Sequence, residues 1–168
     1  RKGVFDILDA AKILVGRGIA PRITLAGKRG DGFGDLVEGV RQRGLEKFVH
    51  LAGEVSKKAK LSLLADSEIY LQPSYYEGFG LATAEAMASG ACVITCDVGE
   101  VRHVVGDAAI YVSPGNASEL ADAIVRATTD TDLRVRMQKA ARERITRCFS
   151  FDVKVESLRS ALAQVGIV

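Results

Sequence analysis

The stretch that decides the fold, Glu68–Thr95, reads EIYLQPSYYEGFGLATAEAMASGACVIT. Two short apolar runs, at residues 68–72 and 92–95, flank a glycine-rich loop at residues 73–80 and a helical segment at 81–89 that ends before Gly90. Neighbouring parallel strands need a crossover connection between them, and a helix is its usual form. The stretch therefore predicts a β-α-β unit with its loop at the carboxyl end of the first strand.

The same alternation continues on both sides of this unit. We expect further strands at residues 22–26, 48–52 and 109–112, and helices at 3–17, 36–43, 58–65 and 101–105, followed by three helices after residue 116. Strands that are short and apolar throughout are typical of a parallel sheet covered by helices on both faces. The sequence predicts one α/β domain over residues 1–168, a doubly wound, Rossmann-like parallel sheet in which residues 149–168 form the closing helix.

Composition excludes several classes of protein. Of 168 residues, 48% are hydrophobic, and 23 Lys and Arg balance 21 Asp and Glu to a net charge of +2. The basic residues are scattered, which disfavours a nucleic-acid-binding face. The longest uncharged stretches, 86–96 and 108–118, fall short of the roughly 20 apolar residues of a membrane-spanning helix. With 3 Cys and 2 His, neither a disulfide framework nor a metal centre is expected. We expect a soluble, cytoplasmic protein without a cofactor.

The loops at the carboxyl ends of the strands are the expected place for a ligand. In doubly wound sheets the binding crevice lies outside these ends. We therefore expect the loops at residues 27–34, 53–57, 73–80 and 95–99 to share one rim. The chain opens at Arg1 without an initiator Met or a signal-peptide pattern, so we expect it to be part of a longer protein.

The loop and helix over residues 73–90 carry the strongest chemical signal. Gly78 and Gly80 allow the backbone to approach a ligand, and free N–H groups at the following helix start suit phosphate oxygens. Glu77 and Glu85 would repel a phosphate, so we interpret them as acceptors for sugar or ribose hydroxyls. Spacing alone fits equally well with solvated acids and ordinary turn glycines.

The same residues resemble a known family. The pattern Pro73-Ser74-x-x-Glu77-Gly-Phe-Gly-Leu-x-x-x-Glu85-Ala-Met-Ala-x-Gly90 resembles the E-x7-E signature of retaining, family-4 glycosyltransferases with the two-lobed GT-B fold. Supporting stretches are Lys2-Gly3, Leu25–Gly27, Leu51–Ser56, Ala65-Asp66, Val98-Gly99 and Val104–Ala108. The resemblance covers nearly the whole chain and implies the C-terminal, donor-binding lobe, with the first strand and the N-terminal acceptor lobe absent.

The resemblance implies roles for individual residues. The donor would be a nucleotide-diphosphate sugar, with Glu77 at the hydroxyls of the transferred sugar, Lys2 on the diphosphate and Glu85 on the ribose hydroxyls. An arginine usually accompanies the lysine from the preceding strand, and Arg1 does not match it. The other implied donor-binding residues are Phe79, Gly80 and Leu81 near phosphate or ribose, and Val55 at the base. The sequence departs from the family pattern at Ala82, Cys92, Glu100 and His103.

The resemblance also sets expectations for the reaction. No Asp-x-Asp pair stands in a metal-binding context, so we expect transfer without a metal ion. The acceptor would bind mainly to the absent lobe, which could associate peripherally with the inner face of the membrane because many acceptors of the family are lipid-linked. This lobe alone would not turn over.

Three alternatives remain open at this point. They are a nucleotide-sugar epimerase of the same fold, a phosphorylase of that fold, and a non-catalytic nucleotide-sugar-binding module. A Rossmann dehydrogenase is disfavoured because residues 30–34 do not match G-x-G-x-x-G.

Overall fold

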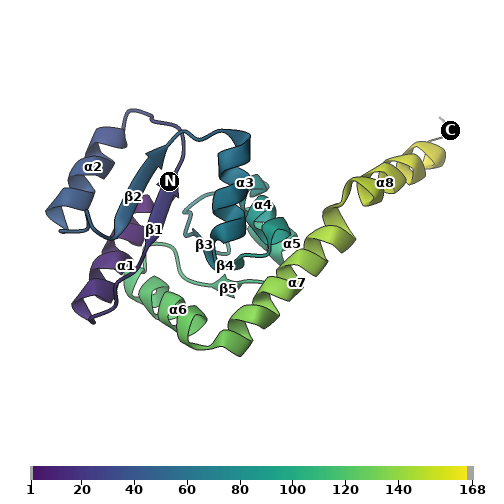
Figure 1. Ribbon diagram of the computed structural model, residues 1–168. Coiled ribbons are helices and arrows are strands. Elements are labelled where there is room, and N and C mark those ends of the chain that lie inside the picture. The colour runs from purple at the N-terminus through teal and green to yellow at the C-terminus, as the bar shows by residue number, and fades with distance from the viewer. Residues whose placement is uncertain (1, 166–168) are drawn as a thin grey trace.

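The computed structural model describes residues 2–165; Arg1 and residues 166–168 lie outside the description. The chain forms α1 (Val4–Gly16), β1 (Ile23–Ala26), α2 (Phe33–Gln42), β2 (Val49–Gly53), α3 (Lys57–Asp66), β3 (Ile69–Gln72), α4 (Leu81–Ser89), β4 (Cys92–Thr95), α5 (Val101–Val105), β5 (Ile110–Tyr111), α6 (Ala117–Thr129), α7 (Thr131–Phe149) and α8 (Phe151–Gln164) (Figure 1). The predicted alternation of strands and helices is confirmed.

All strand pairs are parallel, and they fall into two groups. β1 pairs with β2, while β4 lies between β3 and β5. The predicted single sheet is thus divided, because β1 and β3 do not pair with each other. Helix α1 joins the two groups: Ile7 and Leu14 belong to the apolar cluster around β4, and Leu8 and Ala11 to the cluster around β1 and β2.

Strand β4 is covered on both faces, as a doubly wound sheet requires. Ile94 packs in a cluster with α1 and α6, whereas Val93 packs in a second cluster with α4, α5 and α7. Both side chains are fully buried. Alternate residues of a strand point to opposite faces, so these neighbours anchor the helical layers on the two sides. The α/β fold class predicted from sequence is confirmed.

Helix α2 begins earlier than predicted. It starts at Phe33, within the glycine-rich stretch that the sequence assigns to a loop, and not at Leu36. The Phe33 N–H donates to the Gly30 carbonyl, and the Arg29 guanidinium lies 4.9 Å from the Phe33 ring centroid. These local contacts fix the first turn despite the low helix propensity of Gly34.

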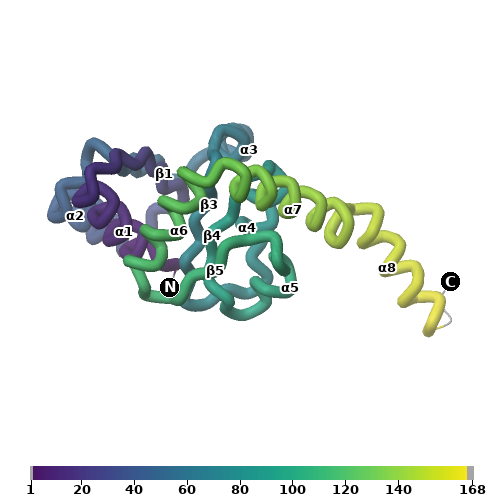
Figure 2. Tube along the Cα trace, turned by 90° about the horizontal axis from the view of Figure 1, so that it is seen from below, coloured from purple at the N-terminus to yellow at the C-terminus, as the bar shows by residue number. Residues whose placement is uncertain are grey.

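Helix α8 extends away from the rest of the molecule (Figures 1 and 2). The break after α7 falls at Ser150, whose hydroxyl accepts from the Val153 N–H as the N-cap of α8. None of the described α8 residues is buried, and Phe151 is 81% exposed. The closing helix predicted over residues 149–168 is helical over 151–164; its predicted start is two residues too early, because Phe149 ends α7 and Ser150 caps α8. Residues 166–168 lie outside the described residues.

Two buried thiols give the fold a measurable pH dependence. Burial raises the pKa of both Cys92 and Cys96 to about 11 from an ordinary value of 9.0. The folded state holds these protons more tightly, so the contribution of the two thiols to the free energy of unfolding is level below about pH 9 and falls as the pH rises toward 11. Each thiol contributes a slope of up to about 1.4 kcal/mol per pH unit.

Urea unfolding between pH 8 and 11 checks this prediction. A Cys92→Ala, Cys96→Ala double variant is expected to lose stability less steeply than the wild type over that range. The tyrosines that also titrate there are common to both proteins, so their contribution cancels. Parallel slopes for the two proteins would contradict the prediction.

Candidate active site

The loops at the carboxyl ends of the strands lie against one another in two pairs. The Gly27 N–H donates to the Gly53 carbonyl at 2.8 Å, which joins the loop after β1 to the end of β2. The Glu100 N–H donates to the Gly78 carbonyl at 3.3 Å, which joins the loops after β3 and β4. Within each pair the strands run parallel, so the two chain segments of a pair stand at the same edge of their sheet.

Glu77, in the loop after β3, is in direct contact with Lys2. The Lys2 ammonium donates to Oε2 of Glu77 at 2.6 Å, and the Glu77 side chain is only 13% exposed. Gly3 makes the contact possible: its φ is +68°, and a Cβ there would overlap the carbonyl oxygen of Pro73. The chain thus passes directly against the start of the loop at residues 73–80 and delivers Lys2 to the carboxylate.

The loop that carries Glu77 is held from two other sides. Gly99, at φ +56°, lies so close that a Cβ would overlap the carbonyl oxygen of Glu77. The Tyr75 hydroxyl donates to Asp6 of α1 at 3.1 Å. The close backbone contact with Gly99 and the hydrogen bond from Tyr75 to Asp6 therefore hold the loop that carries Glu77 in position.

Helix α4 begins directly after this loop. Gly80 is its N-cap residue at φ +79°, and no side chain of the described residues caps the first turn. The first N–H groups of a helix have no acceptor within it and carry the positive end of the helix dipole. Leu81 is 67% exposed, so this helix start lies open at the surface. It is suited to bind an anion.

Phe79 has a neighbour that the sequence does not predict. Its ring lies edge-on to Phe149 at the end of α7, with ring centroids 5.7 Å apart. His103 stacks edge-on to the same Phe149 ring at 5.8 Å. The ring of Phe79 therefore packs toward α7, so a contact of this residue with a donor would come from its backbone or its exposed edge.

Glu85 is paired with a residue that sequence analysis missed. Lys60 of α3 donates to both oxygens of the Glu85 carboxylate, at 2.7 and 2.8 Å. Glu77 and Glu85 thus contact different cations. They share one neighbour, Tyr70 of β3: burial raises the pKa of its phenol, and the charges of Glu77 and then Glu85 raise it further. Both carboxylates therefore lie within electrostatic reach of the same hydroxyl.

The family model for glycosyl transferases group 1 matches residues 1–144, a range that contains Lys2, Glu77 and Glu85 with their ion pairs. The chain belongs to this family. Alpha-D-kanosaminyltransferase of Streptomyces kanamyceticus is 29% identical over 99% of the chain and 43% of its own length. A phosphatidyl-myo-inositol mannosyltransferase of Mycolicibacterium smegmatis is 32% identical over 88% of the chain and 38% of its own length.

The fold of the group 1 lobe agrees with solved structures. Sucrose-phosphate synthase of Thermosynechococcus elongatus superposes with a TM-score of 0.84 at 27% identity, covering 98% of this chain and 42% of that one. A glycosyltransferase of Rickettsia africae gives a TM-score of 0.88 at 21% identity over 98% of this chain and 44% of that one. The chain thus spans less than half the length of these relatives, and its Rossmann-like α/β fold matches one part of them.

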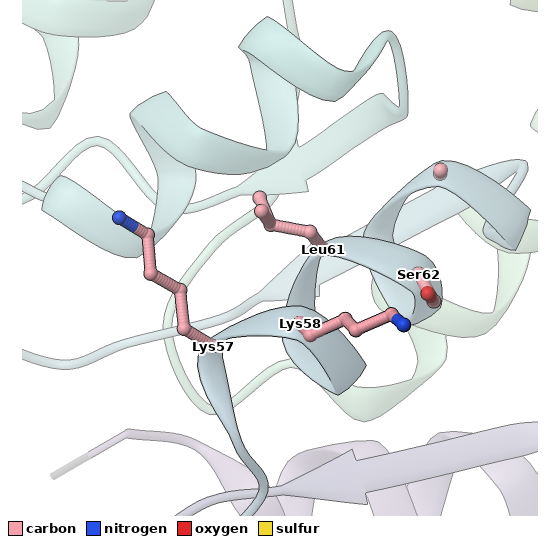
Figure 3. A pocket seen from close by; sticks show the side chains of 5 residues that line it. Lys57, Lys58, Leu61 and Ser62 are labelled. Carbon is pink, nitrogen blue, oxygen red and sulfur yellow. The ribbon is translucent and has the colours of Figure 1, made fainter.

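Val55 is the last of the predicted donor-binding residues of the group 1 lobe. Val55 lies in the loop between β2 and α3, directly before Ser56, which accepts from the Ala59 N–H as the N-cap of α3. A shallow hollow lies on the surface of this helix, as Figure 3 shows. Its lining residues are Lys57, Lys58, Leu61, Ser62 and Ala65. None of the predicted donor-binding residues lines it, so the hollow does not mark the predicted site.

Residues 2–165 of the group 1 lobe contain neither a metal-binding cluster nor a membrane-spanning helix. No group of three or more His, Cys, Asp or Glu side chains is placed to hold a metal ion in this range. Over the same residues, none of the helices combines the length and the apolar composition needed to cross a membrane.

Proposed function

We propose that this chain is the C-terminal, donor-binding lobe of a retaining glycosyltransferase that uses a nucleotide-diphosphate sugar. The observation that carries the proposal is the contact between Lys2 and Glu77 beside the open start of α4. It places a cation, a carboxylate and unpaired helix N–H groups in one small region. Membership of the group 1 family and relatives that are named glycosyltransferases support the same reading.

The proposed chemistry follows from where charge develops. As the bond between the anomeric carbon and the diphosphate stretches, negative charge gathers on the leaving oxygens and positive charge on the sugar ring. Preorganised groups of opposite sign stabilise such a transition state. Lys2 has three N–H donors, so it can keep Glu77 and still donate to a phosphate oxygen. The N–H groups at the start of α4 would receive the other phosphate oxygens.

The remaining residues are assigned to the two ends of the donor. Glu77 would accept hydroxyls of the transferred sugar near its reacting carbon, and Glu85 would accept the ribose hydroxyls. The backbone of Gly80 and Leu81, together with Phe79, would meet phosphate or ribose, and the Val55 backbone would meet the base. Lys2 and the start of α4 supply fixed positive charge at the leaving group, so we propose that transfer needs no metal ion.

The divided sheet supports the proposal that a further strand belongs to this lobe. β1 and β3 are both parallel to their partners, do not pair with each other, and contribute apolar side chains to the same cluster around Ile94. One additional parallel strand between them would complete a single sheet. We assign this position to the strand that the resemblance to the family implies upstream of Lys2, and the acceptor to the lobe that would precede it.

Nucleotide-sugar screening of the full-length protein tests the proposed function. A thermal shift is expected with one class of nucleotide sugar, because a ligand that binds only the folded state raises the melting temperature. Incubation with that donor and an acceptor is expected to give a glycoside with the donor's anomeric configuration, in the presence of EDTA as well as without it.

Each alternative predicts a different product in the same assay. An epimerase would return a changed nucleotide sugar without an acceptor product, and a phosphorylase would release a sugar phosphate when supplied with phosphate. A binding module would give the thermal shift with no product. Inversion at the anomeric carbon would contradict the retaining assignment, and loss of transfer with EDTA would contradict metal independence.

A further inference from the structure

We propose that Tyr70, Gln72 and Ser74 form a hydrogen-bonded chain of positioning residues that fixes the carboxylate of Glu77. The inference rests on the proposed function, since it concerns how Glu77 is presented to the hydroxyls of a transferred sugar. None of the three residues belongs to the set predicted from the sequence. Each acts through Glu77 and not on the substrate itself.

The chain follows one side of β3 and the start of the loop. Tyr70 and Gln72 lie on the same side of β3 because alternate residues of a strand point to one face. The Ser74 N–H donates to the Gln72 carbonyl at 2.9 Å, a tight turn about Pro73 that brings Ser74 into the same row. The Tyr70 hydroxyl donates to Oε1 of Gln72 at 2.7 Å, and Nε2 of Gln72 donates to Oγ of Ser74 at 2.7 Å. Ser74 Oγ then donates to Oε2 of Glu77 at 3.3 Å.

The direction of these hydrogen bonds is set from the end at Glu77. An ionised carboxylate only accepts, so the Ser74 hydroxyl must donate to it and is free to accept from the Gln72 amide. That orients the Gln72 amide with its oxygen toward Tyr70, which must then donate. Each member therefore has one orientation that satisfies its neighbours, and the row ends in a phenol that holds the amide in place.

The surroundings keep this arrangement from exchanging with water. Ser74 is 1% exposed, and the backbone of Gln72 is held by the Thr95 hydroxyl, which donates to its carbonyl at 3.0 Å. Burial, followed by the charges of Glu77 and Glu85, raises the pKa of Tyr70, so its phenol remains a protonated donor at neutral pH. The three hydrogen bonds are part-buried, and satisfied polar networks with limited access to water favour one side-chain conformation.

This hydrogen-bonded chain determines the orientation of the Glu77 carboxylate. The terminal torsion of a glutamate is broad, so an isolated carboxylate rotates readily. Lys2 and Ser74 both contact Oε2, and these are the two contacts that the described residues make with this carboxylate. Oε1 is then the oxygen presented to a sugar hydroxyl. Ser74 fixes the carboxylate from inside the fold, while Lys2 contacts it from the solvent side.

Substitutions in the full-length protein test this role. Tyr70→Phe and Ser74→Ala are each expected to lower kcat by about 10- to 100-fold, the usual effect of a small misplacement of a catalytic group. The Kd for UDP or GDP, measured by calorimetry, is expected to stay within about twofold because neither residue contacts the nucleotide.

Tyr111→Phe is the matched control, because its hydroxyl donates to the Gly106 carbonyl at 2.6 Å in a part-buried setting away from Glu77. It is expected to keep the wild-type kcat. A Tyr70→Phe, Glu77→Gln double variant is expected to be no slower than Glu77→Gln alone, because the network acts only through Glu77. Equal kcat for Tyr70→Phe and Tyr111→Phe, or additive effects in the double variant, would overturn the inference.

A second measurement separates this inference from the proposed function. The ¹³C chemical shift of the Glu77 carboxyl group is expected to change in Tyr70→Phe and Ser74→Ala and to stay unchanged in Tyr111→Phe. If the wild type transfers no sugar from any donor, the proposed function fails, and the carboxyl shift still decides whether the network holds Glu77. An unchanged shift in Ser74→Ala would overturn the network in either case.

Discussion

Glu77→Gln is expected to lower kcat for glycosyl transfer by about 10²–10³-fold in the full-length protein, the loss typical of removing one preorganised electrostatic contact. The substitution preserves the size of the side chain but removes its negative charge beside the developing positive charge on the sugar. It also removes the partner of Lys2, which lies 2.6 Å from the carboxylate. The proposed nucleoside contacts are untouched and Lys2 keeps its positive charge for the diphosphate, so UDP or GDP should bind with little change in Kd.

Steady-state kinetics with two control variants check this expectation. Glu85→Gln should mainly raise the KM for the donor, since its proposed contact is with the ribose in both the ground state and the transition state. Glu38→Gln changes a surface carboxylate whose partners are Arg41 and Gln42, and it should leave both constants unchanged. A Glu77→Gln variant that keeps the wild-type kcat would remove Glu77 from the reaction.

Local sequence signals predict the helices and strands of this fold well. α4 is predicted with both ends because it is bracketed by Gly80 and Gly90, which the structure places at φ +79° and +85°. β4 is predicted with both ends because its apolar run is short and uninterrupted. α2 was predicted to begin three residues too late, because Gly34 obscures a first turn that Arg29 and Phe33 stabilise through contacts outside the helix.

The residues of the candidate site are predictable only in part, because several of their contacts depend on tertiary packing. Glu77 and Glu85 stand in a recognisable pattern, whereas Lys60 and Tyr70 carry no local signal of their contacts with those carboxylates. Lys60 sits in a helix with other lysines, and only the packing of α3 beside α4 selects it for Glu85. Tyr70 occupies a strand position that alternation describes only as buried or exposed. Contacts between elements depend on tertiary packing, which residue spacing does not encode.

Lys2 shows that a family resemblance can indicate a site residue that residue spacing alone does not. Its contact with Glu77 joins residues separated by 75 positions, and the family pattern indicated both of them without giving their distance. The structure adds the cause of the contact, since Gly3 allows the backbone to lie against Pro73. An aliphatic side chain at Gly3 would separate the two residues even though both would remain in the sequence.

Gly99→Ala is expected to lower the free energy of unfolding by about 2–5 kcal/mol and to lower glycosyl transfer as well. Two costs combine in this substitution. An Ala at φ +56° costs about 1–2 kcal/mol of backbone strain, and its Cβ would overlap the carbonyl oxygen of Glu77, for which overpacking costs about 1–3 kcal/mol. The overlap is relieved only if the loop that carries Glu77 moves, so activity should fall even in molecules that remain folded.

Gly18→Ala is the control variant that separates backbone strain from steric overlap of the added Cβ. Gly18 has a φ of +77°, and a Cβ there would meet no atom within 4 Å, so this variant should show the strain of about 1–2 kcal/mol alone. Urea unfolding gives the two stabilities, and kcat measured well below each melting temperature gives the effect on the loop. Gly99→Ala should be the less stable of the two and the only one with a reduced kcat. Equal stabilities and equal kcat values would mean that the loop after β4 does not hold Glu77 in place.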